Sequence, residues 1–145
     1  MPAVTGRGRA DAPVFRPVRG TWIAGVLGVA VTLGGIALAV ALPGDQFGVM
    51  DRLIAGGIGI AAGIFLSRFA TIHARPEADG LWVRNLGPGE RVPWEDIEAI
   101  RFSQGMPFPR LDLSNGMDMT LMAIQRSDGE RSVQEAQRLA DLIGR

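Results

Sequence analysis

The chain has 145 residues with no Cys, and its fifteen basic residues, all of them Arg, balance fifteen acidic ones. The absence of Cys excludes disulfides, thiolate metal sites and Cys nucleophiles. Residues 76–145 hold eight Arg against twelve acidic residues. A nucleic-acid-binding domain concentrates positive charge on itself, so this acidic distal part argues against nucleic acid as a partner.

The chain begins with an Arg-rich segment that precedes two apolar runs. Residues 1–19 lack apolar periodicity, which predicts a flexible arm. Thr21 to Leu42 contains no charge and as a helix would extend about 33 Å, enough to cross the ~30 Å hydrocarbon core. Leu53 to Ser67 is shorter and reaches about 27 Å only if it continues through Ala70. We therefore predict a transmembrane hairpin over residues 20–70.

A cleaved signal peptide is the alternative interpretation of the first run, with Ala39-Val40-Ala41 as its cleavage site. The run is longer than the apolar core of a signal peptide, and a second run follows it, so we favour a retained anchor. Four Arg precede the first run and Arg68 and Arg75 follow the second, against only Arg52 between them. The positive-inside rule then predicts a multi-pass protein of the cell membrane, with both termini cytoplasmic.

Residues 71–145 have the pattern of short strands followed by one helix. Strands are expected at 71–75, 81–84, 91–92, 97–103, 111–114 and 117–123, with turn signals such as Asn115-Gly116 between them and one helical turn at 93–96. Ser127 or Asp128 can cap the helix. Its apolar stripe comprises Val133, Ala136, Leu139, Ala140, Leu142 and Ile143. The order predicts a small α+β domain.

Two segments of this domain carry a family resemblance. Gly80-Leu81-Trp82-Val83-Arg84-Asn85 and Arg91-Val92-Pro93-Trp94-Glu95-Asp96-Ile97 follow the two apolar runs. The arrangement resembles the bacterial pleckstrin-homology-like (PH-like) membrane proteins, especially the actinobacterial type founded on low-molecular-weight protein antigen 6. The similarity covers roughly residues 15–145. It implies a bent antiparallel sheet of about six strands capped by the C-terminal helix, and it transfers no biochemical activity.

No residue pattern predicts an enzyme, a cofactor, a metal site or a small-molecule substrate. His73 is the only His, and no Ser or Cys motif accompanies it, so we interpret it as an ordinary strand residue rather than a proton relay. Asp112 and Asp118 flank a hairpin turn and are expected on the solvated face of two strands.

The second apolar run has a face of small residues that includes Gly56, Gly59 and Gly63. Such a face allows helices to approach closely. We expect it to pack on the first run, near Ala24, Gly28 and Gly35, and the alternative is a helix of a partner.

Two kinds of surface residue remain as candidates for binding. Arg16, Arg19, Arg68 and Arg75 are expected at the membrane surface, where they would attract anionic lipids. Trp82, Met106 and Phe108 are candidate contacts to a protein partner, whereas Trp94 is expected in the core. The loop from Pro76 to Gly80 is acidic, which argues against phosphoinositide-type recognition there. We expect a domain that binds a protein partner or helps to assemble a membrane complex, and the alternative is a lipid- or envelope-sensing module.

Overall fold

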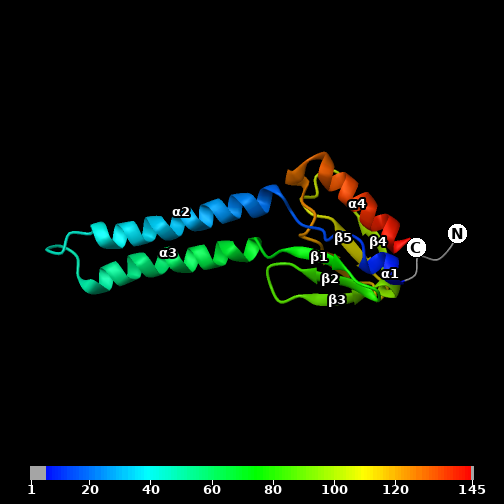
Figure 1. Cartoon of the computed structure of the whole chain (residues 1–145), viewed down its shortest axis with the longest axis horizontal. Coiled ribbons are helices and arrows are strands. Elements are labelled where there is room, and N and C mark those ends of the chain that lie inside the picture. The colour runs from blue at the N-terminus through cyan, green and yellow to red at the C-terminus, as the bar shows by residue number, and fades with distance from the viewer. Residues whose placement is uncertain (1–5, 145) are drawn as a thin grey trace. The chain divides into compact units, whose positions relative to one another are not determined.

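The computed structural model describes residues 6–144 and divides them into two compact units (Figure 1). One unit contains residues 21–70, which form the greater part of two long helices. The other combines residues 6–20 with residues 71–144 and contains all the strands. The two units are described separately below.

The helical unit is an antiparallel hairpin of α2 (Arg19–Ala41) and α3 (Val49–Phe69). α3 begins four residues before the predicted run, because Asp51 accepts a hydrogen bond of 2.8 Å from the Gly48 amide and holds the first turn. Arg52 donates to the Leu42 carbonyl at 2.7 Å. At 21 residues, α3 is about 31 Å long. Both helices are therefore long and apolar enough to cross a membrane.

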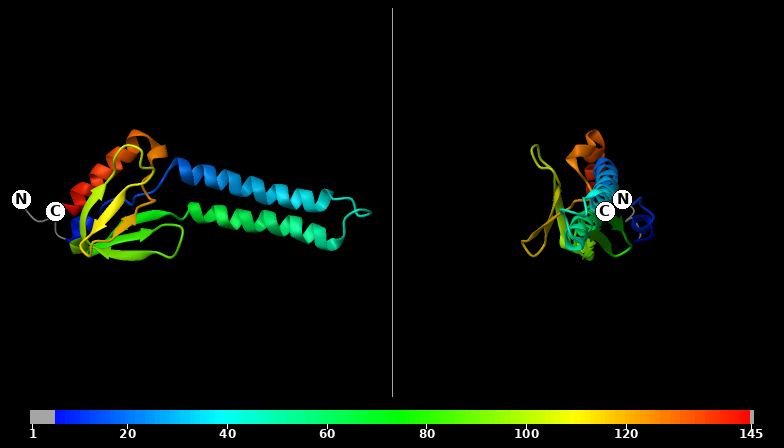
Figure 2. Two further views of the ribbon diagram at one scale, coloured as in Figure 1. Left: turned by 180° about the vertical axis from the view of Figure 1, so that it is seen from behind. Right: turned by 90° about the vertical axis from the view of Figure 1, so that its left-hand side faces the viewer.

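Six strands form the second unit, as the sequence predicts, but they form two sheets. The first contains β1 (His73–Pro76), β2 (Gly80–Arg84) and β3 (Glu90–Pro93), and the second contains β4 (Ile97–Arg101), β5 (Arg110–Leu113) and β6 (Asp118–Thr120). Both are antiparallel meanders. The predicted helical turn, η1 (Trp94–Asp96), separates them. Because Pro93 has no amide hydrogen and η1 redirects the chain, β3 does not continue into β4 in one ladder; Figure 2 shows the two sheets from further sides.

The predicted strand at 117–123 is shorter in the structure. β6 covers only Asp118–Thr120, and the side chain of Met117 is 65% exposed. The Leu121 amide donates to the Pro109 carbonyl at 2.9 Å, outside the β5–β6 ladder. Leu121, Ala123 and Ile124 are nevertheless buried in the core. These three residues are therefore apolar because they are buried in an irregular segment, and not because they alternate along a strand.

The C-terminal helix α4 (Glu130–Ile143) covers the core with Ala136, Leu139 and Leu142, which are all buried. Val133 was predicted in the same stripe but is 54% exposed, and Ser132 is buried in its place. The Ser132 hydroxyl can occupy that position because it donates to the Gly129 carbonyl. The predicted cap is also wrong, since Gly129, with φ +68°, precedes the helix and no side chain caps it.

The N-terminal segment is where the structure differs most from the sequence prediction. Residues 1–5 lie outside the described part of the chain, but residues 6–20 belong to the strand-containing unit and begin with α1 (Gly6–Ala10). Phe15 is completely buried and exchanges backbone hydrogen bonds of 2.8 and 2.9 Å with Ala74. Burying a Phe side chain contributes about 1.5–3 kcal/mol. This segment is therefore an ordered part of the domain and not a flexible arm.

Candidate partner-binding surface

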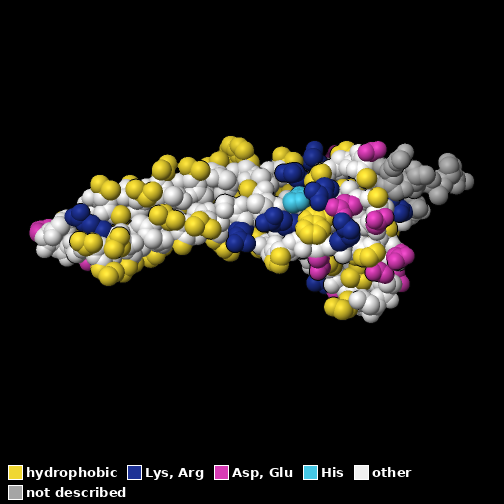
Figure 3. All heavy atoms as spheres, turned by 60° about the horizontal axis from the view of Figure 1, so that its bottom comes forward, with side chains coloured by type: hydrophobic (Ala, Val, Ile, Leu, Met, Phe, Trp, Pro, Cys, Tyr) yellow, Lys and Arg dark blue, Asp and Glu magenta, His cyan; other side chains and the backbone are white. Residues whose placement is uncertain are grey.

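The outer face of the first sheet carries a cluster of Arg side chains around one Trp. Strand alternation turns Ala74, Leu81, Val83 and Val92 into the core. The opposite face carries five residues with basic or aromatic side chains, which we call the basic platform: His73, Arg75, Trp82, Arg84 and Arg91. Figure 3 shows Arg side chains, in dark blue, gathered beside the His side chain, in cyan, with hydrophobic atoms between them.

Cross-strand pairing fixes the order of the platform. Arg75 lies opposite Trp82, and Trp82 lies opposite Arg91, so the indole has an Arg on each neighbouring strand. His73 lies opposite Arg84 at the other end of the β1–β2 pair. Directly opposed residues in an antiparallel pair have Cβ atoms about 4.5–5.5 Å apart. The Arg side chains therefore flank the Trp on a rigid backbone.

One carboxylate holds two of these Arg residues. Oε1 of Glu77 lies 2.9 Å from Nη2 of Arg75, and its Oε2 lies 2.6 Å from Nη2 of Arg91. The second contact is an ion pair without hydrogen-bond alignment, since no aligned donor reaches Oε2. The Glu77 backbone is also fixed, because its carbonyl accepts a hydrogen bond from Nε1 of Trp94 at 2.9 Å. Glu77 therefore positions the two Arg residues and neutralises only one of their charges.

Arg84 is the third Arg of the platform and has no acidic partner among the described residues. Its side chain is half-buried, and its Nε–H group is shielded from solvent without a hydrogen-bond acceptor. Buried donors in folded proteins are nearly always paired. The Arg84 guanidinium is therefore a positive group that the fold itself leaves unsatisfied.

The Trp82 ring packs against the turn between β2 and β3. A Cβ atom built on Gly89 would collide with Cζ2 of the Trp82 ring, so the ring lies over the Gly89 backbone. The residue is accordingly half-buried. The result is an indole ring held against the backbone, with Arg75 and Arg91 opposite it on the neighbouring strands.

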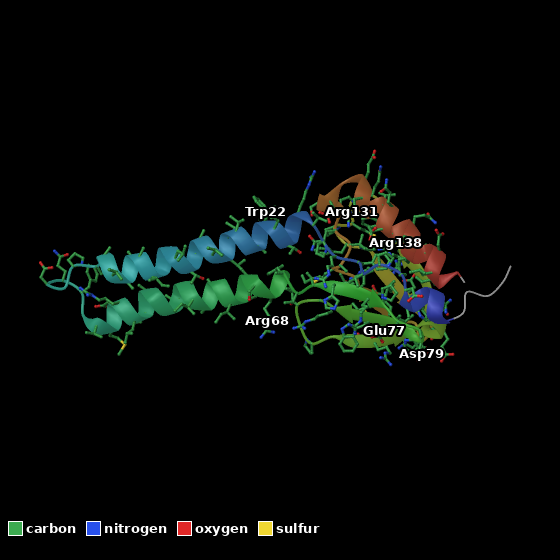
Figure 4. The ribbon with its side chains drawn as sticks, viewed as in Figure 1. Trp22, Arg68, Glu77, Asp79, Arg131 and Arg138 are labelled. Carbon is green, nitrogen blue, oxygen red and sulfur yellow. The ribbon has the colours of Figure 1, made fainter. Side chains whose placement is uncertain are left out.

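The first hairpin loop is held closed by its own contacts. The Glu77 amide donates to the Gly80 carbonyl at 2.8 Å, and the Trp94 amide donates to the Asp79 carbonyl at 3.3 Å. Figure 4 labels the side chains of Glu77 and Asp79 in this region. Trp94 is buried, as the sequence predicts, with the Arg9 guanidinium 5.0 Å from its ring centroid.

The other predicted partner contacts, Met106 and Phe108, are half-buried in the loop between β4 and β5. Arg126 holds this loop, since its Nη2 donates to the Ser103 carbonyl at 2.7 Å and its Nε donates to the Met106 carbonyl at 3.1 Å. The same guanidinium lies 4.0 Å from the Phe102 ring centroid. The loop therefore has a fixed conformation. The sequence does not reveal Arg126 as its anchor, because the two are about twenty residues apart.

On the outer face of the second sheet, unlike on the basic platform, Arg101 and Arg110 are each paired with a separate carboxylate. Arg101 and Asp112 form a 2.8 Å ion pair across β4 and β5, and Arg110 and Asp118 form one of 2.7 Å across β5 and β6. Hydrogen bonding to Asp112 raises the pKa of Arg101 above its usual value, and the charge of Asp112 adds to this. Asp112 and Asp118 therefore lie on the solvated face, as predicted, where their charges are compensated.

The four predicted membrane-surface Arg residues have different surroundings. Arg16 is exposed, and Arg68 is in the last turn of α3. Arg75 pairs with Glu77, as described above. The Arg19 side chain donates to the Ser127 carbonyl at 3.1 Å, and the Arg19 amide donates to Asp128 at 2.9 Å.

In the helical unit, the predicted glycines of α3 face α2. Cβ atoms built on Gly35 and Gly59 would each come within 2.8 Å of the other residue's Cα, so the two backbones are in direct contact. Gly56 lies beside Ala39, and Gly63 lies beside Thr32 and Gly28. A shallow apolar groove of about 410 Å³ runs beside this seam, lined by residues that include Ala24, Gly28, Thr32, Gly63 and Ser67.

His73 has the local role expected of a strand residue, since its Nδ1 lies 2.8 Å from the Thr71 carbonyl oxygen. Among residues 6–144, no group of three or more His, Cys, Asp or Glu residues is placed to hold a metal ion.

Comparison with known proteins identifies the strand-containing domain. Residues 74–142 match the family model of the bacterial PH domain. Uncharacterised proteins of Mycobacterium tuberculosis and Mycobacterium bovis are 29% identical over 133 residues, which cover 92% of this chain and 86% of theirs. No solved structure gives a significant match. The resemblance to bacterial PH-like proteins is confirmed, and these relatives are actinobacterial, as it implies.

Proposed function

Since residues 74–142 belong to the bacterial PH domain family, we propose that the chain is a non-enzymatic integral membrane protein whose cytoplasmic PH domain binds a protein partner. In this proposal the hairpin of α2 and α3 anchors the chain in the cell membrane, with both termini in the cytoplasm. The domain then recruits or assembles a membrane complex.

The observation that supports membrane anchoring is the exposure of the hairpin's apolar side chains. Only Ala24 and Gly28 are buried in α2, and only Gly59 is buried in α3. Apolar residues such as Trp22, which is 71% exposed, cover the remaining surface. Two uniformly apolar helices without a protein covering are stable in lipid but not in water.

The structure of the strand-containing domain supports binding of a ligand through its outer surface. Its core is filled by apolar side chains from both sheets and α4. The basic platform and the loop that Arg126 holds are fixed before any ligand arrives. Preorganised surfaces bind with a smaller loss of conformational entropy. These features support binding of a macromolecule by surface contact.

Lipid or envelope sensing is the second candidate function, and the Arg residues near the helix ends favour it. An Arg near an anionic leaflet contributes about 1 kcal/mol of attraction. However, Glu77 pairs with Arg75, and the Arg19 side chain is bound to the Ser127 carbonyl. Glu77 and Asp79 also place negative charge in the loop where eukaryotic PH domains carry a basic one. We therefore rank partner binding first.

Site-specific photocrosslinking in intact membranes tests the proposal. A photoreactive amino acid is placed at Phe108 or Trp82 in the full-length chain, with Arg131 on the exposed side of α4 as the control position. We expect a discrete protein adduct from Phe108 or Trp82 and none from Arg131. Adducts with lipid alone from Phe108 and Trp82 would overturn partner binding and favour lipid sensing.

A further inference from the structure

We propose that the basic platform binds an acidic peptide segment of the protein partner, with Arg84 as the principal carboxylate-binding residue. This inference rests on the proposed function and adds the chemistry of the partner. Three observations carry it: the local charge, the unsatisfied guanidinium of Arg84 and the position of Trp82.

The platform concentrates positive charge on a domain that is otherwise acidic. Residues 76–145 hold eight Arg against twelve acidic residues. On the outer face of the first sheet, however, three Arg residues accompany one paired carboxylate. Glu77 pairs with Arg75 and Arg91, whereas Arg84 has no acidic partner among the described residues. A patch whose sign is opposite to that of its surroundings selects a partner of complementary charge and orients it. The complementary partner is anionic.

Arg84 provides the specific binding group. Its charge is unpaired within the described residues, and its Nε–H lacks an acceptor. A carboxylate of the partner would supply the missing negative charge at the terminal Nη groups, since the Nε–H itself is shielded from solvent. Arg–carboxylate pairs often form two parallel hydrogen bonds, which are stronger than those between neutral groups. The ligand group at Arg84 is therefore a carboxylate of the partner.

The position of Trp82 favours a peptide ligand over a membrane surface. A Trp that anchors a protein to lipid projects its ring toward the headgroup region. The Trp82 ring instead packs against the Gly89 backbone, and the neighbouring strands carry Arg75 and Arg91 opposite it. An indole held in this position can contact an extended chain, whose neighbouring carboxylates would reach the Arg residues. The occupant that fits is an extended acidic peptide with apolar residues between its carboxylates.

The probe that tests this proposal is a fluorescein-labelled peptide of alternating Glu and Leu, and the same peptide with Gln in place of Glu is its control. Fluorescence anisotropy with the full-length protein in non-ionic detergent should show binding of the Glu peptide that weakens with added salt. Arg84→Gln should weaken that binding about tenfold or more, because a charge-assisted hydrogen bond is lost. Arg131→Gln removes the same charge from α4 and should leave the affinity unchanged.

Charge reversal provides a second variant. Arg84→Glu should abolish binding of the Glu peptide while the domain keeps its near-UV circular dichroism. Equal affinity of the wild type and Arg84→Gln for the Glu peptide would overturn the inference, as would equal binding of the Gln peptide. If Arg84→Gln weakened only the binding of vesicles containing phosphatidylglycerol, the platform would be a lipid surface and the inference would be wrong. If the peptide test failed but Phe108 still crosslinked to a protein, the proposed function would stand without this inference.

Discussion

The guanidinium of Arg138 lies over the ring of Phe15, with its Cζ atom 3.8 Å from the ring centroid. Arg138 also donates to the Pro13 carbonyl at 2.8 Å and pairs with Glu135 at 2.6 Å. A residue of α4 thus covers a residue of the N-terminal segment from more than 120 positions away in the sequence. The strand-containing unit therefore includes residues on both sides of the helical hairpin in the sequence.

Replacing Phe15 with Ala should destabilise the domain by about 3–5 kcal/mol, because the side chain is completely buried and its loss leaves a cavity. Denaturant unfolding of the full-length protein in detergent, followed by near-UV circular dichroism, measures the change. Val18→Ala is the matched control, since Val18 is 50% exposed in the same segment. An unchanged midpoint for Phe15→Ala would show that the segment is not part of the core.

Leu139 and Val133 provide a paired test of α4. Leu139→Ala should cost about 2–5 kcal/mol because its side chain is fully buried. Val133→Ala should change stability by less than about 0.5 kcal/mol, since Val133 is more than half exposed. The same unfolding experiment compares the two variants. Equal losses would mean that the helix is rotated from the orientation described here.

Asp128→Ala should destabilise the domain by about 1 kcal/mol. The Asp128 carboxylate accepts hydrogen bonds from the amides of Val18 and Arg19 at 3.0 and 2.9 Å, and an exposed hydrogen bond contributes about 0.5–1.5 kcal/mol. Asp128→Asn retains an acceptor oxygen and should lose less. Amide hydrogen exchange at Val18 and Arg19 provides a local measurement. Exchange that is equally slow in wild type and Asp128→Ala would contradict this role.

The register of the hairpin can be tested with an engineered disulfide, because the chain has no Cys of its own. A Cβ on Gly56 would lie 3.6 Å from the Cβ of Ala39, close to the separation found in disulfides. The variant with Ala39→Cys and Gly56→Cys should therefore crosslink on mild oxidation, detected as a mobility shift in denaturing electrophoresis. Gly57→Cys in place of Gly56→Cys should not, because a Cβ built on Gly57 has no atom of α2 within 4 Å. Efficient crosslinking of both pairs would contradict the register.

Local sequence patterns predict much of this fold, because many of the residues that determine it lie close together in the sequence. Asn115-Gly116 indicates a tight hairpin, and Gly116 has φ +82°. The split into two sheets depends on Pro93 and η1, whose effect on the strand ladder is a matter of tertiary geometry. The burial of Phe15 depends on Ala74 and Arg138, which are distant in sequence, so no local period reveals it.

In the candidate site too, local patterns can be predicted from the sequence, whereas tertiary contacts cannot. Trp82 can be placed on the outer face from its alternation with Leu81 and Val83. Its association with Arg75 and Arg91 requires the cross-strand register, which the sequence does not specify. Arg84 was not predicted as a site residue, because its lack of a partner is visible only once the positions of the surrounding acidic side chains are known.

The most direct test of the central claim is the accessibility of single Cys residues in intact cells. Because the natural chain contains no Cys, Asp45→Cys in the hairpin loop and Ser114→Cys in the PH domain each report one position. Both positions are exposed in the structure. A membrane-impermeant maleimide added to cells with a permeabilised outer envelope should label Asp45→Cys, whereas Ser114→Cys should react only after the inner membrane is disrupted. Labelling of Ser114→Cys with the inner membrane intact would contradict an integral membrane protein with a cytoplasmic PH domain.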